Sequence, residues 1–217
     1  MRAWIYDRAI LPLTASWYAE VLGRVPERAR LLDVGIGTGG ALVAHAELVR
    51  AKRLRIHGID VDAAYVRRCR DRIERAGLED RVHVAVEPFD AHLGGPYEAI
   101  YFSGSFMLLP DPIAAIRHAR RLLADDGLAY FTQTFEHRRS VLAERVKPWL
   151  RHLTTIDFGR VTYEDDFRAA ITAGGAEVVE MITLKEGARR SARLAIARAA
   201  RPSGAPARTR SRRLSGA

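Results

Sequence analysis

The 217-residue chain has a single cysteine, Cys69, and no long run of apolar residues. One cysteine excludes a disulfide within the chain and a zinc site built from cysteines. No apolar stretch approaches the roughly 20 residues that a membrane-spanning helix needs. The first residues also lack the apolar segment of a secretory signal. These absences predict a protein without a membrane span, and the cytoplasm is its expected location.

Close pairs of histidines are absent as well. The seven histidines are scattered along the chain, and none pairs with another at the short spacing that is typical of metal ligands. The sequence therefore predicts no metal site.

Acidic residues are missing from residues 199–217, which carry five arginines of a chain whose net charge is +9. A Pro/Ser/Gly/Ala/Arg segment cannot build an apolar core, and we expect it to be disordered. A solvated terminus is the favoured interpretation. The alternative is a tail that contacts nucleic acid or an anionic membrane surface.

The rest of the chain has the composition of a folded domain. Hydrophobic residues make up 48% of the sequence, and the length suits one α/β domain with a substantial core. We expect a single domain over residues 1–198. It includes a helical leader at 1–25 and a helical insertion at 136–158.

One stretch, Leu31 to Gly40, organises the prediction. Its apolar start reads as the end of a buried parallel strand, a glycine-rich turn follows, and Ala41 to Arg50 has a helical pattern. Glycines let a backbone turn tightly and approach a ligand without a Cβ. The following helix directs its free N–H groups at the turn. This strand–turn–helix unit is typical of a site for a nucleotide-like ligand.

Two ligand families are compatible with the glycine spacing. Gly35, Gly37 and Gly40 satisfy the G-x-G-x-x-G pattern of dinucleotide-binding sites, and Asp60 lies about 20 residues further on. An NAD-type oxidoreductase therefore stays among the alternatives.

The second pattern, D/E-x-G-x-G-x-G, is met by Asp33, Gly35, Gly37 and Gly39. On these residues the chain resembles the class I S-adenosylmethionine-dependent methyltransferases. Asp33 favours this resemblance, because a carboxylate would repel a pyrophosphate but attract the ammonium and sulfonium of S-adenosylmethionine.

Strands and helices alternate along the chain, and a hairpin follows them. This order predicts a doubly wound, mostly parallel sheet, and the resemblance implies seven strands of which the last is antiparallel. We expect strands at 54–59, 82–86, 99–102, 128–134, 178–184 and 192–197, and helices at 62–76, 111–123 and 162–173.

The leader has Leu13, Trp17 and Val21 on one helical stripe. In families that the chain resembles, such a leader often folds over the cofactor, so Tyr6 is a candidate cofactor contact. The alternative is that Tyr6 simply packs on the core.

The resemblance implies a role for each residue at the strand ends. Asp60 would bind both ribose hydroxyls, Asp90 would accept from the adenine amino group, and Phe89 and Ala91 would line the adenine ring. Ser103 would face the reactive side of the donor. The implied cofactor-binding residues are Asp33, Gly35, Ile36, Gly37, Thr38, Gly39, Asp60, Val61, Asp90, Ala91, Ser103 and Tyr6.

The sequence identifies no catalytic residue. Residues 103–106 lack the Asn/Asp-Pro-Pro-Tyr/Phe motif of enzymes that methylate exocyclic or amide nitrogens. The stretch from Tyr101 to Asp111 resembles small-molecule and lipid-precursor enzymes of the quinone-biosynthesis type. Glu136, His137 and His152 are candidate bases, although structural histidines are more common. We therefore expect a small-molecule acceptor. The alternative is an RNA methyltransferase or cofactor-binding subunit that uses the basic tail.

Overall fold

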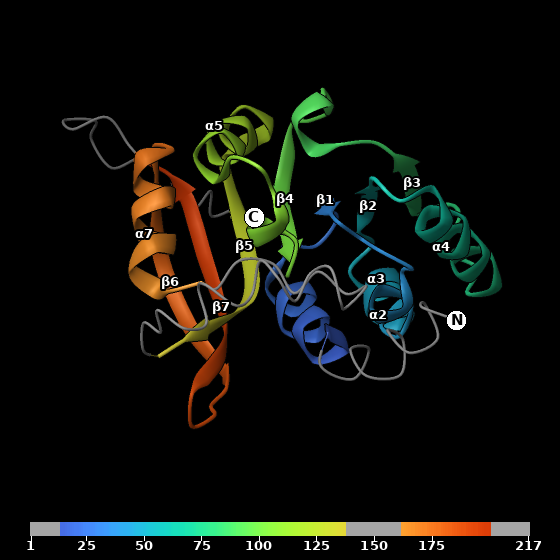
Figure 1. The fold of residues 1–217 in the computed structure, drawn as a ribbon. Helices are drawn as coiled ribbons and strands as arrows, with labels where there is room; N and C mark the ends of the chain where they lie inside the picture. Colours follow the sequence, from blue (N-terminus) through green and yellow to red (C-terminus); the bar gives the residue numbers. More distant parts are fainter. Residues whose placement is uncertain (1–13, 138–161, 201–217) are drawn as a thin grey trace, which may run out of the picture.

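The computed structural model describes residues 14–137 and 162–200. They form a seven-stranded sheet with the strand order β3-β2-β1-β4-β5-β7-β6 (Figure 1). The strands are β1 (Arg30–Val34), β2 (Arg55–Asp60), β3 (Val82–Val86), β4 (Tyr97–Ser103), β5 (Leu123–Glu136), β6 (Ala176–Lys185) and β7 (Arg190–Ala199).

Strand directions confirm the predicted architecture. The neighbours from β3 to β5 pair in parallel, whereas β7 pairs antiparallel with both β5 and β6. The final hairpin thus inserts its last strand between β5 and β6. Because β1 to β4 run in parallel, their carboxyl ends meet at one edge, where ligands of such sheets bind.

Helices cover both faces of the sheet (Figure 1). One face packs against the helix at residues 14–24, α2, α3 and α4, and the other against α5 and α7. The helical elements are α2 (Gly40–Val43), α3 (Ala46–Ala51), α4 (Ala63–Arg75), η1 (Phe89–Ala91), η2 (Phe106–Leu108), α5 (Pro112–Leu122) and α7 (Glu164–Ala173).

Two helix starts confirm sequence predictions. Asp62 caps α4 by accepting hydrogen bonds from the N–H groups of Ala64 (2.7 Å) and Tyr65 (3.2 Å). Asp111 caps α5 in the same way through Ala114 N–H, at 2.9 Å. The buried stripe of α4 consists of Val66, Cys69 and Ile73, as the helical spacing predicts.

Two local predictions were wrong. The single helix expected to run to Arg50 is broken into α2 and α3 around His45, whose ring Nε2 bonds the carbonyl of Ala15 at 2.7 Å. The strand expected at 128–134 begins earlier, at Leu123, which pairs with Tyr97, and the next pair along is Leu128 with Ala99. Residues 124–127 therefore bulge out of a continuous strand.

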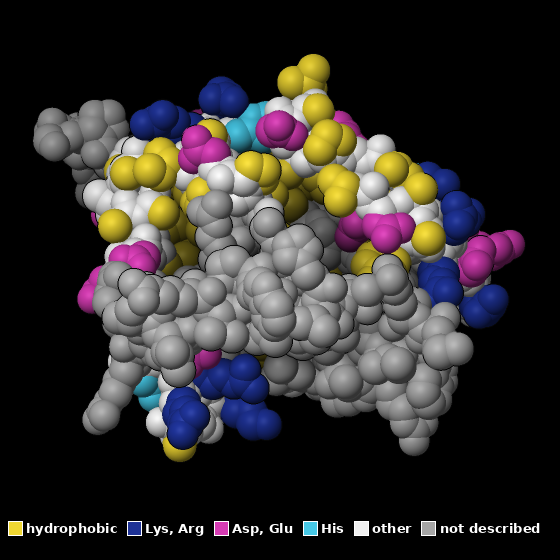
Figure 2. Space-filling model, viewed as in Figure 1, with side chains coloured by type: hydrophobic (Ala, Val, Ile, Leu, Met, Phe, Trp, Pro, Cys, Tyr) yellow, Lys and Arg dark blue, Asp and Glu magenta, His cyan; other side chains and the backbone are white. Residues whose placement is uncertain are grey.

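The arginines of α4 lie on its solvent side. Figure 2 shows basic side chains over this helix, with acidic side chains among them. Arg67, Arg68 and Arg70 are exposed, and so are Asp71 and Glu74. This mixture indicates a solvated helix surface.

Several predictions lie outside the described residues, namely Tyr6, His152, the insertion from residue 138 to 158 and the tail from residue 201. Strand β7 extends to Ala199, and Ala200 N–H bonds the carbonyl of Gly175 at 3.0 Å. Residues 199 and 200, just past the expected boundary at 198, therefore still take part in backbone pairing of the sheet. In the described part of the chain no helix is long and apolar enough to cross a membrane.

Candidate functional site

The glycine turn joins β1 to α2 at the carboxyl edge of the sheet. Gly35, Gly37 and Gly39 have φ values of +77°, +61° and +70°, which residues other than glycine rarely adopt. A Cβ at Gly35 would lie 2.6 Å from Ser105 Cβ, and one at Gly39 would lie 2.4 Å from Cys69 Sγ. A Cβ at Gly37 would meet nothing within 4 Å among residues 14–137 and 162–200. Gly37 therefore presents bare backbone to an open space, as a ligand cradle requires.

Asp60 ends β2 and faces this turn. Its Oδ2 accepts the N–H of Gly37 at 2.9 Å, and its Oδ1 accepts the N–H of Asp62 at 2.9 Å. Burial raises the pKa of the Asp60 carboxyl, while backbone hydrogen bonds from Asp62, Gly37 and Val61 oppose the rise. Each carboxylate oxygen has a further lone pair, so Asp60 can still accept two hydroxyl donors.

Asp33 lies beneath the turn and is fully buried. The hydroxyl of Tyr18 donates to its Oδ2 at 2.7 Å, whereas Oδ1 has no hydrogen-bond partner in the described part of the chain. Burial raises the pKa of the Asp33 carboxyl to about 7, the Tyr18 hydrogen bond opposes the rise, and the charge of Asp60 adds to it. A buried carboxylate oxygen without a partner is a suitable acceptor for a cationic group.

Tyr18 is the partner that sequence reasoning missed. It is buried, and its ring packs edge-on against Tyr101 with the centroids 5.0 Å apart. The predicted stripe of the leader helix contained Trp17 and Val21 but not Tyr18. All three are buried, together with Leu22 and Val25. Extending the helical spacing from Tyr18 to Leu22 would have detected it.

The other residues of the turn have different environments. Thr38 is buried, and Arg72 of α4 donates to its carbonyl oxygen at 3.1 Å and to its hydroxyl at 2.5 Å. Ile36 is also buried and packs over Gly58 of β2. Val61, directly after Asp60, is 73% exposed, so it offers an apolar surface beside the carboxylate.

The ends of β3 and β4 complete the edge. Asp90 and Ala91 are exposed in η1, whereas Phe89 is buried against Phe102 and His118. Phe89 therefore belongs to the core and does not line a ring site, contrary to the expectation. Ser103 ends β4 and is half-buried.

Further along the same edge, β5 and α7 border a hollow of about 440 Å³. Its acidic residues are partly paired: Arg193 bonds Glu164, and His137 Nε2 lies 3.1 Å from a carboxylate oxygen of Glu186. Both Glu136 and His137, two of the three candidate bases, line it. The full lining is Phe135, Glu136, His137, Tyr163, Glu164, Asp165, Glu186 and Arg193.

A second hollow, of about 470 Å³, lies at the opposite edge of the sheet. Its lining consists of Arg28, Arg53, Arg55 and Arg81, which precede or begin β1, β2 and β3. These residues are therefore separate from the glycine turn.

The comparisons with known proteins agree with this geometry. The model of a family described as "Methyltransferase domain" matches residues 6–181, most of the chain. A malonyl-acyl-carrier-protein O-methyltransferase of Geobacter sulfurreducens is 33% identical over 126 residues, which are 52% of this chain and 46% of that protein. The chain spans about half the length, or less, of the curated relatives that it matches.

Solved structures show the same fold. The cyclase SpnF matches with a TM-score of 0.70 at 17% identity, over 90% of this chain and 83% of that one. An S-adenosylmethionine-dependent methyltransferase of Geobacter sulfurreducens, solved with S-adenosylhomocysteine, matches with a TM-score of 0.64 at 14% identity. That match covers 85% of this chain and 90% of the other.

Proposed function

The chain belongs to the class I S-adenosylmethionine-dependent methyltransferases, and we propose that it transfers a methyl group to a small-molecule acceptor. One observation carries the proposal. The Asp60 carboxylate accepts the Gly37 N–H at 2.9 Å, so the residue expected to bind the ribose is joined to a glycine at which a Cβ would meet nothing within 4 Å among the described residues.

The described residues fit the parts of S-adenosylmethionine. Asp60 would accept the two ribose hydroxyls, since one carboxylate can form two charge-assisted hydrogen bonds to a vicinal diol. The unpartnered Oδ1 of Asp33 would face the ammonium group. Val61 and Ala91 would border the adenine, with Asp90 accepting from its amino group.

The cofactor supplies an activated methyl group, so the protein contributes mainly alignment and electrostatics. We place the acceptor on the side of β4 and β5, where it would lie beside the donor for an in-line displacement. Ser103 and the hollow that contains Glu136 and His137 lie on that side in the strand order. We propose Glu136 and His137 as the groups that take a proton from an acceptor that must lose one.

Incubation with methyl-labelled S-adenosylmethionine and pools of small molecules tests this function. Mass spectrometry should detect a labelled small-molecule product together with S-adenosylhomocysteine. The same assay with Asp60→Ala is the control, because its product should fall with donor affinity. Label that appears only in RNA would contradict the proposal and support the alternative acceptor class.

Donor affinity should depend on pH through Asp33. In the free protein its pKa is about 7, and a ligand ammonium favours the ionised form. Affinity for S-adenosylhomocysteine should therefore rise between pH 5.5 and 7.5 by up to about 20-fold and then level off. Calorimetric titrations across this range measure the effect, and Asp33→Asn should flatten the profile.

The raised pKa of Asp33 also makes the stability of the fold depend on pH. Folded Asp33 holds its proton up to about pH 7, whereas the unfolded chain loses it near pH 4, so this group stabilises the fold most at low pH. Its contribution should decrease as the pH rises from about 4 to about 7. Comparing unfolding free energies of the wild type and Asp33→Asn across these pH values isolates it. A pH-independent difference would refute the assignment.

Removal of the chain after Ala200 should leave donor affinity within about twofold of the wild type. Strand β7 ends at Ala199, and Ala200 makes the last described backbone bond, so the cut spares the sheet. Titration of both forms with S-adenosylhomocysteine checks the expectation. A steeply salt-dependent affinity for RNA that disappears with the tail would favour the nucleic-acid alternative.

The cytoplasmic location stays a prediction from the sequence.

A further inference from the structure

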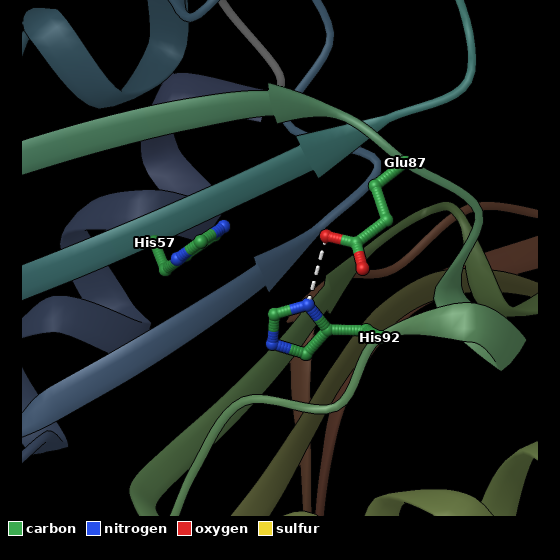
Figure 3. A group of neighbouring side chains, drawn as sticks. All are labelled: His57, Glu87 and His92. Atoms are coloured by element: carbon green, nitrogen blue, oxygen red, sulfur yellow. Dashed lines mark hydrogen bonds and ion pairs between the residues drawn. The ribbon is translucent and has the colours of Figure 1, made fainter.

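Three side chains that are far apart in the sequence converge on the face of β2 that α4 does not cover. His57 lies in the middle of β2, Glu87 follows β3, and His92 follows η1. One ligand atom from each lies within 4.8 Å of the others. Figure 3 shows the two imidazoles and the carboxylate grouped around a common space.

The hydrogen bonds of this cluster leave one position unused. His92 Nδ1 lies 2.9 Å from Glu87 Oε2, and His92 Nε2 lies 2.9 Å from the hydroxyl of Tyr97. Nε2 of His57 is buried and has no hydrogen-bond partner among the residues that the structure describes. The rings of His57 and His92 meet edge to face with their centroids 5.0 Å apart. A buried, unsatisfied ring nitrogen beside a His–Glu pair needs an explanation, because such groups are costly.

We propose that His57, Glu87 and His92 bind one divalent transition-metal ion, with zinc as the best match. Two imidazoles and one carboxylate are ligands that zinc uses in three-residue sites with a fourth position for water. Magnesium and calcium prefer sites made of oxygen ligands. The ion would be bound by Nε2 of His57, a Glu87 oxygen and Nδ1 of His92.

The surroundings suit this arrangement. Metal-bound histidines usually hydrogen-bond through their other ring nitrogen, and Tyr97 already holds Nε2 of His92 in place. Ligand atoms around a tetrahedral zinc are about 3.4 Å apart at bond lengths near 2.1 Å. The ligand atoms lie within 4.8 Å of one another, so the three side chains would move closer together on binding an ion. His92 is buried, but the Glu87 side chain is 27% exposed, so an ion can enter from its side.

The position of the cluster gives the ion a role. Glu87 N–H donates to the carbonyl of Asp60 at 3.0 Å, and Glu87 precedes Asp90 by three residues. An ion bound to His57 and to both ends of residues 87–92 would fasten this segment to β2. It would thereby fix the position of Asp90. The proposed metal site does not depend on the proposed function. Its role in positioning Asp90 does depend on that function.

Zinc titration of the chelator-treated full chain tests the site. We expect one equivalent to bind and to raise the melting temperature by roughly 5–10 °C at a hundredfold excess over Kd. His57→Gln and Glu87→Gln should weaken binding by about 100-fold or more and about tenfold or more, respectively. Both variants leave the buried His92 intact, and their melting curves without metal report on folding.

His83→Gln is the matched control. His83 is the exposed register partner of His57 on β3 and is not a member of the cluster, so its loss should leave zinc affinity unchanged. Absence of binding at 100-fold the protein concentration would overturn the proposal. Binding that survives both glutamine variants would do the same, because the ion would then be held elsewhere.

Hydrogen exchange tests the fastening of residues 87–92 separately from zinc binding itself. Zinc should slow exchange of the amides in residues 87–92 in the wild type but not in His57→Gln. Unchanged exchange in a protein that binds one zinc through His57 would overturn the fastening role. Donor binding by the metal-free chain is measured separately, so failure of the proposed function and failure of the metal site give different results.

Discussion

Asp60→Ala is expected to weaken the binding of S-adenosylhomocysteine by about 30- to 1,000-fold. The substitution removes a carboxylate proposed to accept both ribose hydroxyls. Each hydrogen bond to a charged group contributes about 1.5–3 kcal/mol, and losses at one residue are rarely additive, so we expect roughly 2–4 kcal/mol in total. The structure adds a second cause, because the same carboxylate holds the Gly37 N–H at 2.9 Å. Isothermal titration calorimetry gives the affinity.

Asp62→Ala provides the matched control two residues away. Asp62 caps α4 through Ala64 and Tyr65, and its loss should cost about 1 kcal/mol of unfolding free energy with donor affinity almost intact. Both variants remove one carboxylate from the same strand–helix junction. If Asp62→Ala weakened the donor and Asp60→Ala did not, the proposed roles of the two residues would be wrong.

Gly39→Ala is expected to lower the unfolding free energy by about 2–5 kcal/mol. A residue with a side chain costs roughly 1–2 kcal/mol at a positive φ, and overpacking a core adds about 1–3 kcal/mol. Both apply, since Gly39 has a φ of +70° and its new Cβ would lie 2.4 Å from the buried Cys69 Sγ. Chemical denaturation measures the loss. The double variant Gly39→Ala/Cys69→Ala should recover the packing part, and no recovery would contradict this explanation.

Gly37→Ala, in contrast, should reduce donor affinity more than it reduces stability. Its φ of +61° carries the same backbone cost of about 1–2 kcal/mol, but a Cβ there meets nothing within 4 Å. The open space is where the donor should lie, so we expect affinity for S-adenosylhomocysteine to fall at least about tenfold while the fold survives. Donor affinity equal to that of the wild type would place the ligand elsewhere.

Local signals were sufficient to predict much of the fold. Asp62 and Asp111 stand before helical patterns as N-caps, and the structure uses both in that way. The residues 82–86 were predicted as a strand and form β3 with the same bounds. The hairpin at the end of the chain predicted an antiparallel strand, which is β7. These features depend on neighbours in the sequence, and their signals are therefore visible in it.

Features that depend on tertiary contacts were not predictable. The helix break at His45 coincides with a hydrogen bond from its ring to Ala15 in the leader helix. The pairing of Tyr18 with Asp33 joins a helix to a strand through two buried side chains. The grouping of His57, Glu87 and His92 was likewise not predicted, because His57 and His92 are far apart in the sequence until the β2–β3 connection and η1 bring them together. The spacing of residues along the sequence does not indicate such contacts.

The most direct test of the central claim is a pair of calorimetric titrations of the full chain, one with S-adenosylhomocysteine and one with NAD. The glycine turn, Asp33 and Asp60 predict one bound S-adenosylhomocysteine per chain, no measurable NAD binding, and S-adenosylhomocysteine binding that is about 30- to 1,000-fold weaker in Asp60→Ala. Binding of NAD without S-adenosylhomocysteine would contradict the account, because the buried carboxylate of Asp33 would then lie beneath a pyrophosphate.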